Sequence, residues 1–154
     1  MKEKNPSKYS HLTCYLPDEL FLKASLYLIQ QDQKVNFPDV FNYYATGSNQ
    51  AKDMPNIVGQ LNIFPDEDGI LRVKSKCARW KDRNKLSYSP ILLPKDSLLT
   101  KAIILGMHRR TSHAGVYTLL SELRKQFYIP HYFSTVKKLL KCCVNCRRFN
   151  QKNN

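Results

Sequence analysis

Apolar residues recur at helical spacing in the first part of the chain. In residues 19–37 the recurrence of the apolar residues Leu20, Ala24, Tyr27 and Leu28 predicts one helix, which ends before the proline that follows. The acidic residues at its start suit the positive end of a helix dipole. The next stretch, 41–56, FNYYATGSNQAKDMPN, is rich in Asn, Ser and Gly, and this composition predicts a loop.

Two short β-prone segments flank a turn in residues 63–73, IFPDEDGILRV. The Pro-Asp-Glu-Asp-Gly run between them predicts a hairpin, with Ile70, Leu71 and Val73 as the apolar residues of the returning strand. A further apolar run, in residues 85–96, KLSYSPILLPKD, is bracketed by two prolines. Because proline lacks a backbone donor, this run predicts an edge strand or an extended connection.

Three helices are predicted in the last third of the chain. Asp96 or Ser97 can cap the first helix, which leads to His108. The second helix covers residues 116–127, VYTLLSELRKQF, and the third covers residues 132–143, YFSTVKKLLKCC. Three short helices in about fifty residues bury too little apolar surface to be stable alone, so an additional stabilising link, such as a bound metal ion, is expected.

Basic residues are concentrated in the same part of the chain. The sequence holds 25 Lys and Arg against 12 Asp and Glu, a net charge of +13. Residues 101–154 contain 11 of these basic residues and a single acid, Glu122, and so carry a net charge of +10. Such a concentration favours a polyanionic partner, nucleic acid first and an anionic membrane second, over a merely solvated basic face.

The composition disfavours several other classes of protein. The chain has no run of about 18 apolar residues, so no membrane span is expected. Its start, MKEKNPSKYSHLTCYLPDEL, lacks the apolar segment of a secretory signal. The five cysteines are an odd number, which favours reduced thiols or metal ligands over a disulfide scaffold. We therefore expect an intracellular protein, nuclear or cytoplasmic.

Two histidines and a Cys-x2-Cys pair frame the three predicted helices. Four residues separate His108 from His113, and another 29 separate His113 from Cys143, which pairs with Cys146. Two imidazoles and two thiolates on a tight turn complete the tetrahedral coordination of one Zn²⁺. Because protein donors fill all four positions, no metal-bound water is activated and the zinc is structural. Cys142 offers a Cys-x3-Cys alternative, but the tighter spacing favours Cys143.

These elements predict an α+β fold class. The expected architecture is a zinc-stapled three-helix bundle, preceded by a small β-hairpin or sheet extension and an N-terminal helix. We divide the chain into an N-terminal helical connector (1–52), a small β extension (53–96) and a His2Cys2 zinc-binding helical domain (97–154).

The last third of the chain also resembles a known family. The segments PILLPKD, HRRTSHAGV, FYIP and CCVNCRRF within residues 90–149 are similar to the His-His-Cys-Cys zinc-binding domain of retroelement integrases, most closely those of the BEL/Pao class of LTR retrotransposons. The preceding segments resemble, more loosely, the β extension and helical connector found before this domain in such polyproteins. The resemblance implies that the two His and two Cys residues bind the metal. It also implies that the domain supports integrase multimers and engages the DNA ends of the element.

The chain departs from the family pattern at several positions. Ala114 stands where relatives often carry glycine, and Lys74–Lys76 stand where a glycine-rich turn is common. The chain also stops where the family's catalytic core begins. That core supplies a DDE carboxylate triad that binds two divalent metals, whereas Glu122 is the one acid after residue 100 and the acids at 66–68 fall in the predicted turn. We therefore expect no catalysis by this chain alone.

Cations on the predicted helices form the expected DNA-binding surface. Lys137, Lys138 and Lys141 share one helical face at a spacing that follows a phosphate backbone. Contacts of this kind give affinity without sequence choice. The complete set comprises Arg109, Arg110, Arg124, Lys125, Lys137, Lys138, Lys141, Arg147 and Arg148.

Aromatic residues accompany these cations and leave two interpretations open. Tyr117, Tyr128 and Phe149 can stack on bases, or they can pack in the core and at its rim. The function likewise has an alternative, a protein–protein module in which the zinc bundle forms a homo-oligomer or docks on a partner such as an integrase core. In that case the positive charge only aids solubility.

Overall fold

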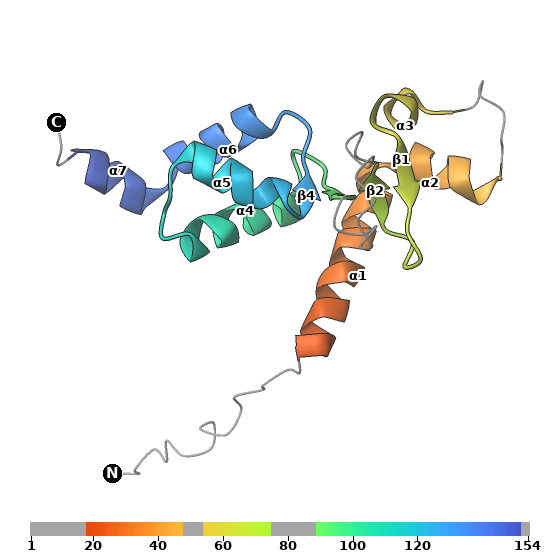
Figure 1. The fold of residues 1–154 in the computed structure, drawn as a ribbon, viewed down its shortest axis with the longest axis horizontal. Coiled ribbons are helices and arrows are strands. Elements are labelled where there is room, and N and C mark those ends of the chain that lie inside the picture. The colour runs from red at the N-terminus through yellow and green to blue at the C-terminus, as the bar shows by residue number, and fades with distance from the viewer. Residues whose placement is uncertain (1–17, 48–53, 75–88, 152–154) are drawn as a thin grey trace, which may run out of the picture.

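The computed structural model describes residues 18–47, 54–74 and 89–151. Within these ranges the chain forms seven helices and one four-stranded sheet, which confirms the predicted α+β class. The helices are α1 (Asp18–Asn36), α2 (Pro38–Ala45), α3 (Asn56–Leu61), α4 (Leu98–Arg110), α5 (Val116–Arg124), α6 (Tyr132–Lys141) and α7 (Val144–Gln151). The strands are β1 (Ile63–Pro65), β2 (Leu71–Val73), β3 (Ile91–Leu92) and β4 (Phe127–Tyr128). Figure 1 shows α4 to α7 on one side of the sheet and α2 and α3 on the other.

Helix α1 confirms the predicted N-terminal helix and ends before Pro38. Residues 41–45, predicted as a loop, instead belong to helix α2. Pro38 is the first residue of α2, a position whose backbone N–H makes no hydrogen bond within a helix, so proline is tolerated there. Val40 is buried, and Phe41 packs against the same core. The loop prediction was wrong at these residues because packing of the apolar face outweighs the Asn-rich composition. Residues 48–53 of that predicted loop lie outside the described part of the chain.

The predicted hairpin is confirmed by the antiparallel pairing of β1 with β2. Asp66 organises its turn, because Oδ1 accepts hydrogen bonds from the backbone N–H groups of Asp68 (3.1 Å) and Ile70 (2.9 Å). The other oxygen of Asp66 pairs with Nε of Arg72 at 2.5 Å. Gly69 adopts a φ of +71°, which glycine tolerates without strain. Asp66 thus has a structural task in the turn.

Strand β3 lies inside the sheet, whose strand order is β1-β2-β3-β4. It pairs antiparallel with β2 and parallel with β4, so it is a central strand, and the prediction of an edge strand or an extended connection was wrong. The flanking prolines leave the N–H groups of Ile91 and Leu93 available, and these donate to the carbonyls of Gln126 (2.9 Å) and Tyr128 (2.8 Å). Residues 85–88, the start of that predicted segment, lie outside the described ranges.

Strand β4 replaces the predicted end of a helix. The helical pattern extends to Phe127, but α5 ends at Arg124 and the chain is extended from Phe127. Backbone pairing with β3 and the burial of Ile129 (1% exposed) favour the extended form over another helical turn. Parallel strands need a crossover connection, and the crossover from β3 to β4 consists of α4 and α5.

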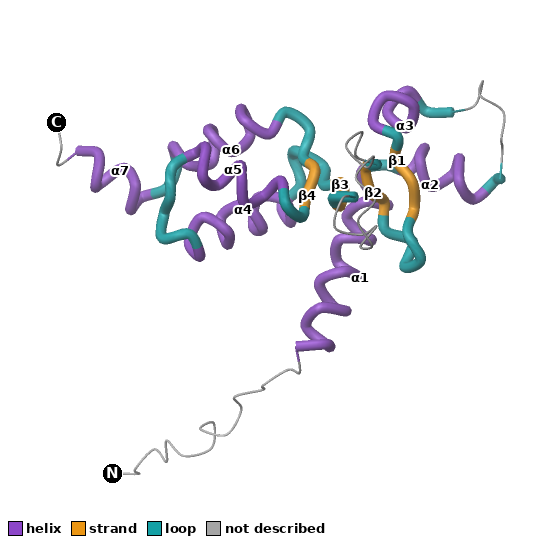
Figure 2. The backbone as a smooth tube through the Cα atoms, in the orientation of Figure 1, coloured by secondary structure: helices purple, strands orange, loops and turns teal. Residues whose placement is uncertain are grey.

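Two apolar cores lie on opposite faces of the sheet. Ile91 and Leu93 belong to the core that α1, α4, α5 and α6 form on one face. Leu92 belongs to the core that α2, α3 and the hairpin form on the other face, as the alternation of side chains along a strand requires. Figure 2 shows the short strands between α4 to α6 on one side and α2 and α3 on the other.

Gln33 ties α1 to the sheet. Its side chain is fully buried, and Nε2 donates to the carbonyls of Leu71 (2.9 Å) and Leu92 (2.7 Å). Its Oε1 accepts from the N–H of Leu71 at 2.8 Å. Because buried polar groups need such partners, this one amide holds α1, β2 and β3 in a fixed arrangement.

The helices of the last third agree with the sequence pattern in most respects. Ser97 caps α4, because its Oγ accepts from the N–H groups of Leu99 (3.0 Å) and Thr100 (3.3 Å). Helices α4, α5 and α6 contact one another. Helix α7 was not predicted. None of the described helices is long and apolar enough to cross a membrane.

The division into 1–52, 53–96 and 97–154 stays a prediction. The sheet receives strands from the second and third of these segments, and both of them contribute to the core that contacts α1.

Candidate metal centre

The end of α4 brings His113 back to His108. The N–H of His113 donates to the carbonyl of His108 at 2.8 Å, and that of Ser112 donates to the carbonyl of Arg109 at 3.1 Å. These are the two hydrogen bonds of a Schellman motif. Ser112 and His113 have φ values of 52° and 59°, so the chain reverses directly after the helix. The reversal places the two imidazole rings 4.6 Å apart, centroid to centroid.

The two cysteines lie where α6 gives way to α7. Cys143 immediately precedes α7, and its carbonyl accepts a hydrogen bond from the N–H of Arg147 at 3.0 Å. The backbone N–H of Cys146 donates to the sulfur of Cys143 and lowers the pKa of Cys143, as is usual for a thiol at a helix N-terminus. Burial raises the pKa of Cys146. A bound cation counteracts this effect by stabilising the thiolate.

The four donor atoms converge at one point. All lie within 4.8 Å of one another. Nε2 of His108 is 3.0 Å from Nδ1 of His113 and 3.2 Å from Sγ of Cys146, and Nδ1 of His113 is 3.4 Å from Sγ of Cys143 and 3.8 Å from Sγ of Cys146. Zn–N bonds of about 2.05 Å and Zn–S bonds of about 2.3 Å in a tetrahedron give donor separations of about 3.3 to 3.8 Å. The observed spacing therefore fits Zn²⁺.

His108 is the most buried member of the group, with 1% of its surface exposed. Burial, assisted by the neighbouring His113, lowers the pKa of His108. The imidazole is thereby kept neutral, as a metal ligand needs to be. Two nitrogens and two sulfurs at tetrahedral spacing are the donor set of a structural zinc site.

Comparison with known proteins agrees with this chemistry. Residues 95–152 match the family model of the integrase zinc binding domain. The match contains all four members of the donor group. Together the two findings support one structural Zn²⁺ in the matched segment, residues 95–152, which is called the zinc domain below. No curated protein and no solved structure matched the chain.

Cys142 of the zinc domain lies outside the donor group. Its side chain is exposed, and its Sγ lies 3.6 Å from the carbonyl oxygen of Lys138, one turn back on α6. The donor group contains Cys143, the residue that the tighter spacing favours.

Asn145 of the zinc domain is a residue that the sequence analysis missed. The nitrogen of its side-chain amide lies 3.2 Å from Nε2 of His113. Nδ1 of His113 faces the donor group, so the proton of the neutral imidazole is on Nε2. If the side-chain amide of Asn145 is flipped by 180°, its Oδ1 takes the place of the nitrogen and accepts a hydrogen bond from this N–H. Such outer contacts fix the tautomer and orientation of a metal-binding histidine. Its position between the two cysteines was the one available signal.

All nine cations of the predicted DNA-binding surface are exposed. Lys125 pairs with both carboxylate oxygens of Glu122, at 2.7 and 2.8 Å. Arg124 lies over the ring of Tyr132, with its Cζ 5.5 Å from the ring centroid. From residue 97 onward the sequence thus carries these positive charges with a single acid, Glu122, and that acid pairs with Lys125.

Proposed function

We propose that the zinc domain is a zinc-stapled three-helix unit that binds the phosphate backbone of DNA, derived from a BEL/Pao-like retroelement integrase. His108, His113, Cys143 and Cys146 are the ligands of its one Zn²⁺. The metal joins the end of α4 to the start of α7 and so encloses α5 and α6. Its binding energy acts mainly as folding energy, and catalysis by this chain alone is not part of the proposal.

The observation that carries the proposal is the exposure of all nine cations on the zinc domain. A rigid surface of Lys and Arg that lacks free acids attracts a polyanion and releases counterions when it binds one. Lys137, Lys138 and Lys141 are exposed on α6, at a spacing that lets neighbouring side chains reach successive phosphates. The expected contact is to the backbone and independent of sequence.

Salt dependence of duplex DNA binding tests the proposal. The affinity of the zinc-loaded chain should fall steeply with salt, with a log–log slope of about −0.9 for each phosphate contacted. Replacing Lys137, Lys138 and Lys141 by Gln should make this slope shallower by about 2 to 3. The matched control replaces Lys23 and Lys34, exposed lysines of α1, and should leave the slope unchanged. A wild-type affinity that is independent of salt refutes the proposal.

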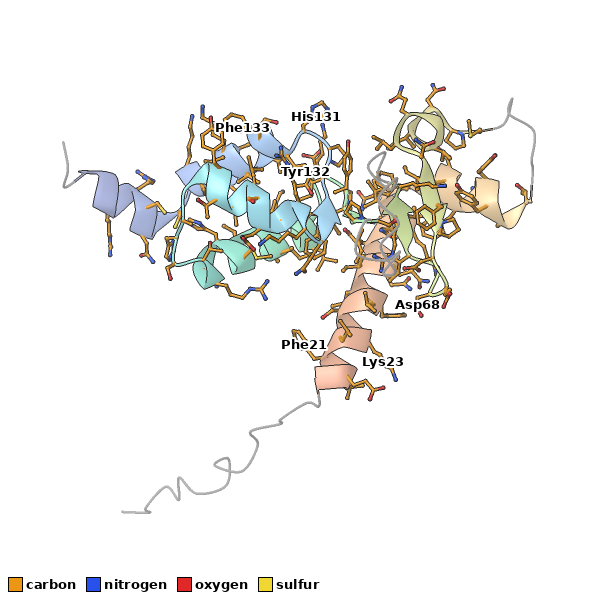
Figure 3. All side chains as sticks on the ribbon, in the orientation of Figure 1. Phe21, Lys23, Asp68, His131, Tyr132 and Phe133 are labelled. Atoms are coloured by element: carbon orange, nitrogen blue, oxygen red, sulfur yellow. The ribbon has the colours of Figure 1, made fainter. Side chains whose placement is uncertain are left out.

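Self-association is a second candidate function, and the surface of α1 favours it. Phe21, Leu28 and Val35 are 66%, 55% and 79% exposed and follow one another at seven-residue intervals, the repeat of a helix–helix seam. Figure 3 shows Phe21 and Lys23 near the end of α1 that projects from the rest of the molecule. Antiparallel pairing of two copies about Leu28 would place Phe21 of one copy beside Val35 of the other.

Sedimentation of the zinc-loaded chain with and without DNA separates the two functions. If α1 pairs with α1 of a second copy, Leu28→Glu should convert a dimer into a monomer, because a charge is placed at the centre of the seam. DNA affinity per zinc domain should change little. A monomer at all accessible concentrations removes this candidate and leaves the DNA-binding proposal intact.

A further inference from the structure

Two exposed aromatic side chains meet on the surface between α5 and α6. Tyr117 is 78% exposed and Phe133 is 43% exposed, yet their ring centroids lie 5.8 Å apart with the planes tilted by 41°. The buried face of α5 is formed by other residues, Leu119, Leu120 and Leu123, so Tyr117 takes no part in the core. Phe133 lies at the start of α6, next to His131 and Tyr132 (Figure 3).

One cation lies directly against this aromatic pair. The Nζ of Lys137 lies 5.5 Å from the ring centroid of Phe133, one helical turn further along α6. Phe133 therefore has Tyr117 and Lys137 as neighbours, whereas the ring of Tyr117 is open to solvent over most of its surface. The exposed cations on α5, at its C-cap and on α6 are Arg124, Lys125, Lys137, Lys138 and Lys141, and the one acid among these elements, Glu122, pairs with Lys125.

We propose that Tyr117 is a stacking site for an unpaired nucleobase, with Phe133 as its support and Lys137 as a contact for the adjoining phosphate. This inference rests on the proposed DNA-binding function and names its substrate class, a nucleic acid with at least one base outside a duplex. A base offers a flat, uncharged face of the size of an aromatic ring, attached to a phosphate that needs a cation close by. The aromatic ring and the cation of this surface match both features.

The charge around the pair argues against a protein partner of ordinary composition. Exposed aromatic residues also mark protein interfaces, but the centres of such interfaces are depleted in lysine. Glu122 is the one acid of α5 and α6, and Lys125 already binds it. A surface of aromatic and cationic side chains without free acids is typical of single-strand binding sites.

The test compares a single-stranded thymidine oligonucleotide with a blunt duplex of the same length. An oligonucleotide of about 12 residues lies within the usual site sizes of roughly 4 to 16 nucleotides. Tyr117→Leu, in the full zinc-loaded chain, should lower affinity for the single strand roughly 5- to 150-fold, because one stacked base is lost. Tyr117→Phe should retain the wild-type affinity, since the ring is kept. Tyr27→Leu, at another exposed tyrosine (62%) on α1, is the matched control and should have no effect.

The outcomes separate this inference from the proposed function. If Tyr117→Leu binds the single strand as tightly as wild type, or weakens duplex binding by the same factor, the stacking site is refuted while backbone binding stands. If Tyr117→Leu instead abolishes self-association and spares the single strand, the aromatic pair is a protein interface. If wild type binds neither nucleic acid, the proposed function itself is refuted. Zinc content and circular dichroism of each variant establish that it is folded.

Discussion

Replacing Gln33 by leucine should destabilise the chain far more than an ordinary helix substitution. Leucine has a similar volume, so the main loss is the set of three buried hydrogen bonds to Leu71 and Leu92. Each buried group left without a partner costs about 1 to 3 kcal/mol. The expected loss is therefore about 3 kcal/mol or more, out of the roughly 5 to 15 kcal/mol that stabilise a typical domain.

Urea unfolding followed by circular dichroism measures this loss, with zinc held at one fixed excess so that metal binding contributes equally to each variant. Gln30→Leu is the matched control. Gln30 lies on the same helix and donates to the carbonyl of Asp68 at 2.9 Å in an exposed setting. Water can replace that bond, so the control should lose less than about 1 kcal/mol. Equal losses for Gln30→Leu and Gln33→Leu would refute the reasoning.

Gln33→Glu probes the same site through pH. A protonated glutamic acid can accept from the N–H of Leu71 and donate to one carbonyl, whereas a carboxylate there faces two carbonyl oxygens. The folded state should therefore raise the pKa of this acid above its usual value of about 4.3. The free energy of unfolding of Gln33→Glu should be closest to that of wild type below about pH 4.3, where the acid is protonated in both states, and should fall as pH rises through the folded pKa. A deficit that does not change with pH contradicts the assigned hydrogen bonds.

Three further predictions concern the metal centre, and one concerns its backbone. Cys143→Ser should abolish tight zinc binding and lower the melting temperature of the chain, whereas Cys142→Ser should leave both unchanged, as measured by competition with a chromophoric chelator and by thermal melts followed by circular dichroism. Asn145→Ala should weaken zinc binding roughly 10-fold or more, and Asn145→Asp should retain it, because a carboxylate also accepts the imidazole proton; equal affinities of all three proteins would exclude this contact. The metal-free chain should lose stability as pH falls, because burial lowers the folded pKa of His108 and the unfolded chain binds the proton more tightly below about pH 6.5; thermal melts across this range give the slope. Ser112→Gly should raise stability by up to about 1 kcal/mol, because Ser112 has a φ of 52°, which glycine adopts without strain, and a lower melting temperature for this variant would contradict the Schellman motif.

Local signals in the sequence were sufficient for some elements. The hairpin turn has its own chemistry in Asp66 and Gly69, and the cap of α4 is the hydroxyl of Ser97, so both could be placed without knowledge of the rest of the fold. The donor group followed from spacing, because zinc coordination restricts which residues can serve together. In these cases the residues that determine the structure are close neighbours in the chain or share one chemical requirement.

Other elements depend on partners that are distant in sequence. Phe127 continues a helical pattern, but the free backbone groups of β3 make an extended conformation more favourable there. The first residues of the predicted loop, 41–45, are helical because Val40 and Phe41 pack in the core that α2 forms with the hairpin. The role of Asn145 is recognisable only from its contact with His113, which is 32 residues away in the sequence. Tertiary contacts decide each of these cases, and single-sequence patterns do not report them.

The parallel pairing of β3 with β4 connects the segment that carries the metal-binding residues to the sheet by backbone hydrogen bonds. Strand β4 lies between the histidine and cysteine halves of the donor group in sequence, whereas β3 precedes residue 95, where the family match begins. The N–H groups of Ile91 and Leu93 donate to backbone carbonyls at Gln126 and Tyr128, in and next to β4. If loss of the metal releases the segments on both sides of β4, these two amide protons should exchange faster with solvent, because their acceptors are then held less firmly. The zinc-dependent change in hydrogen exchange is therefore expected to extend to β3, which lies outside the matched segment.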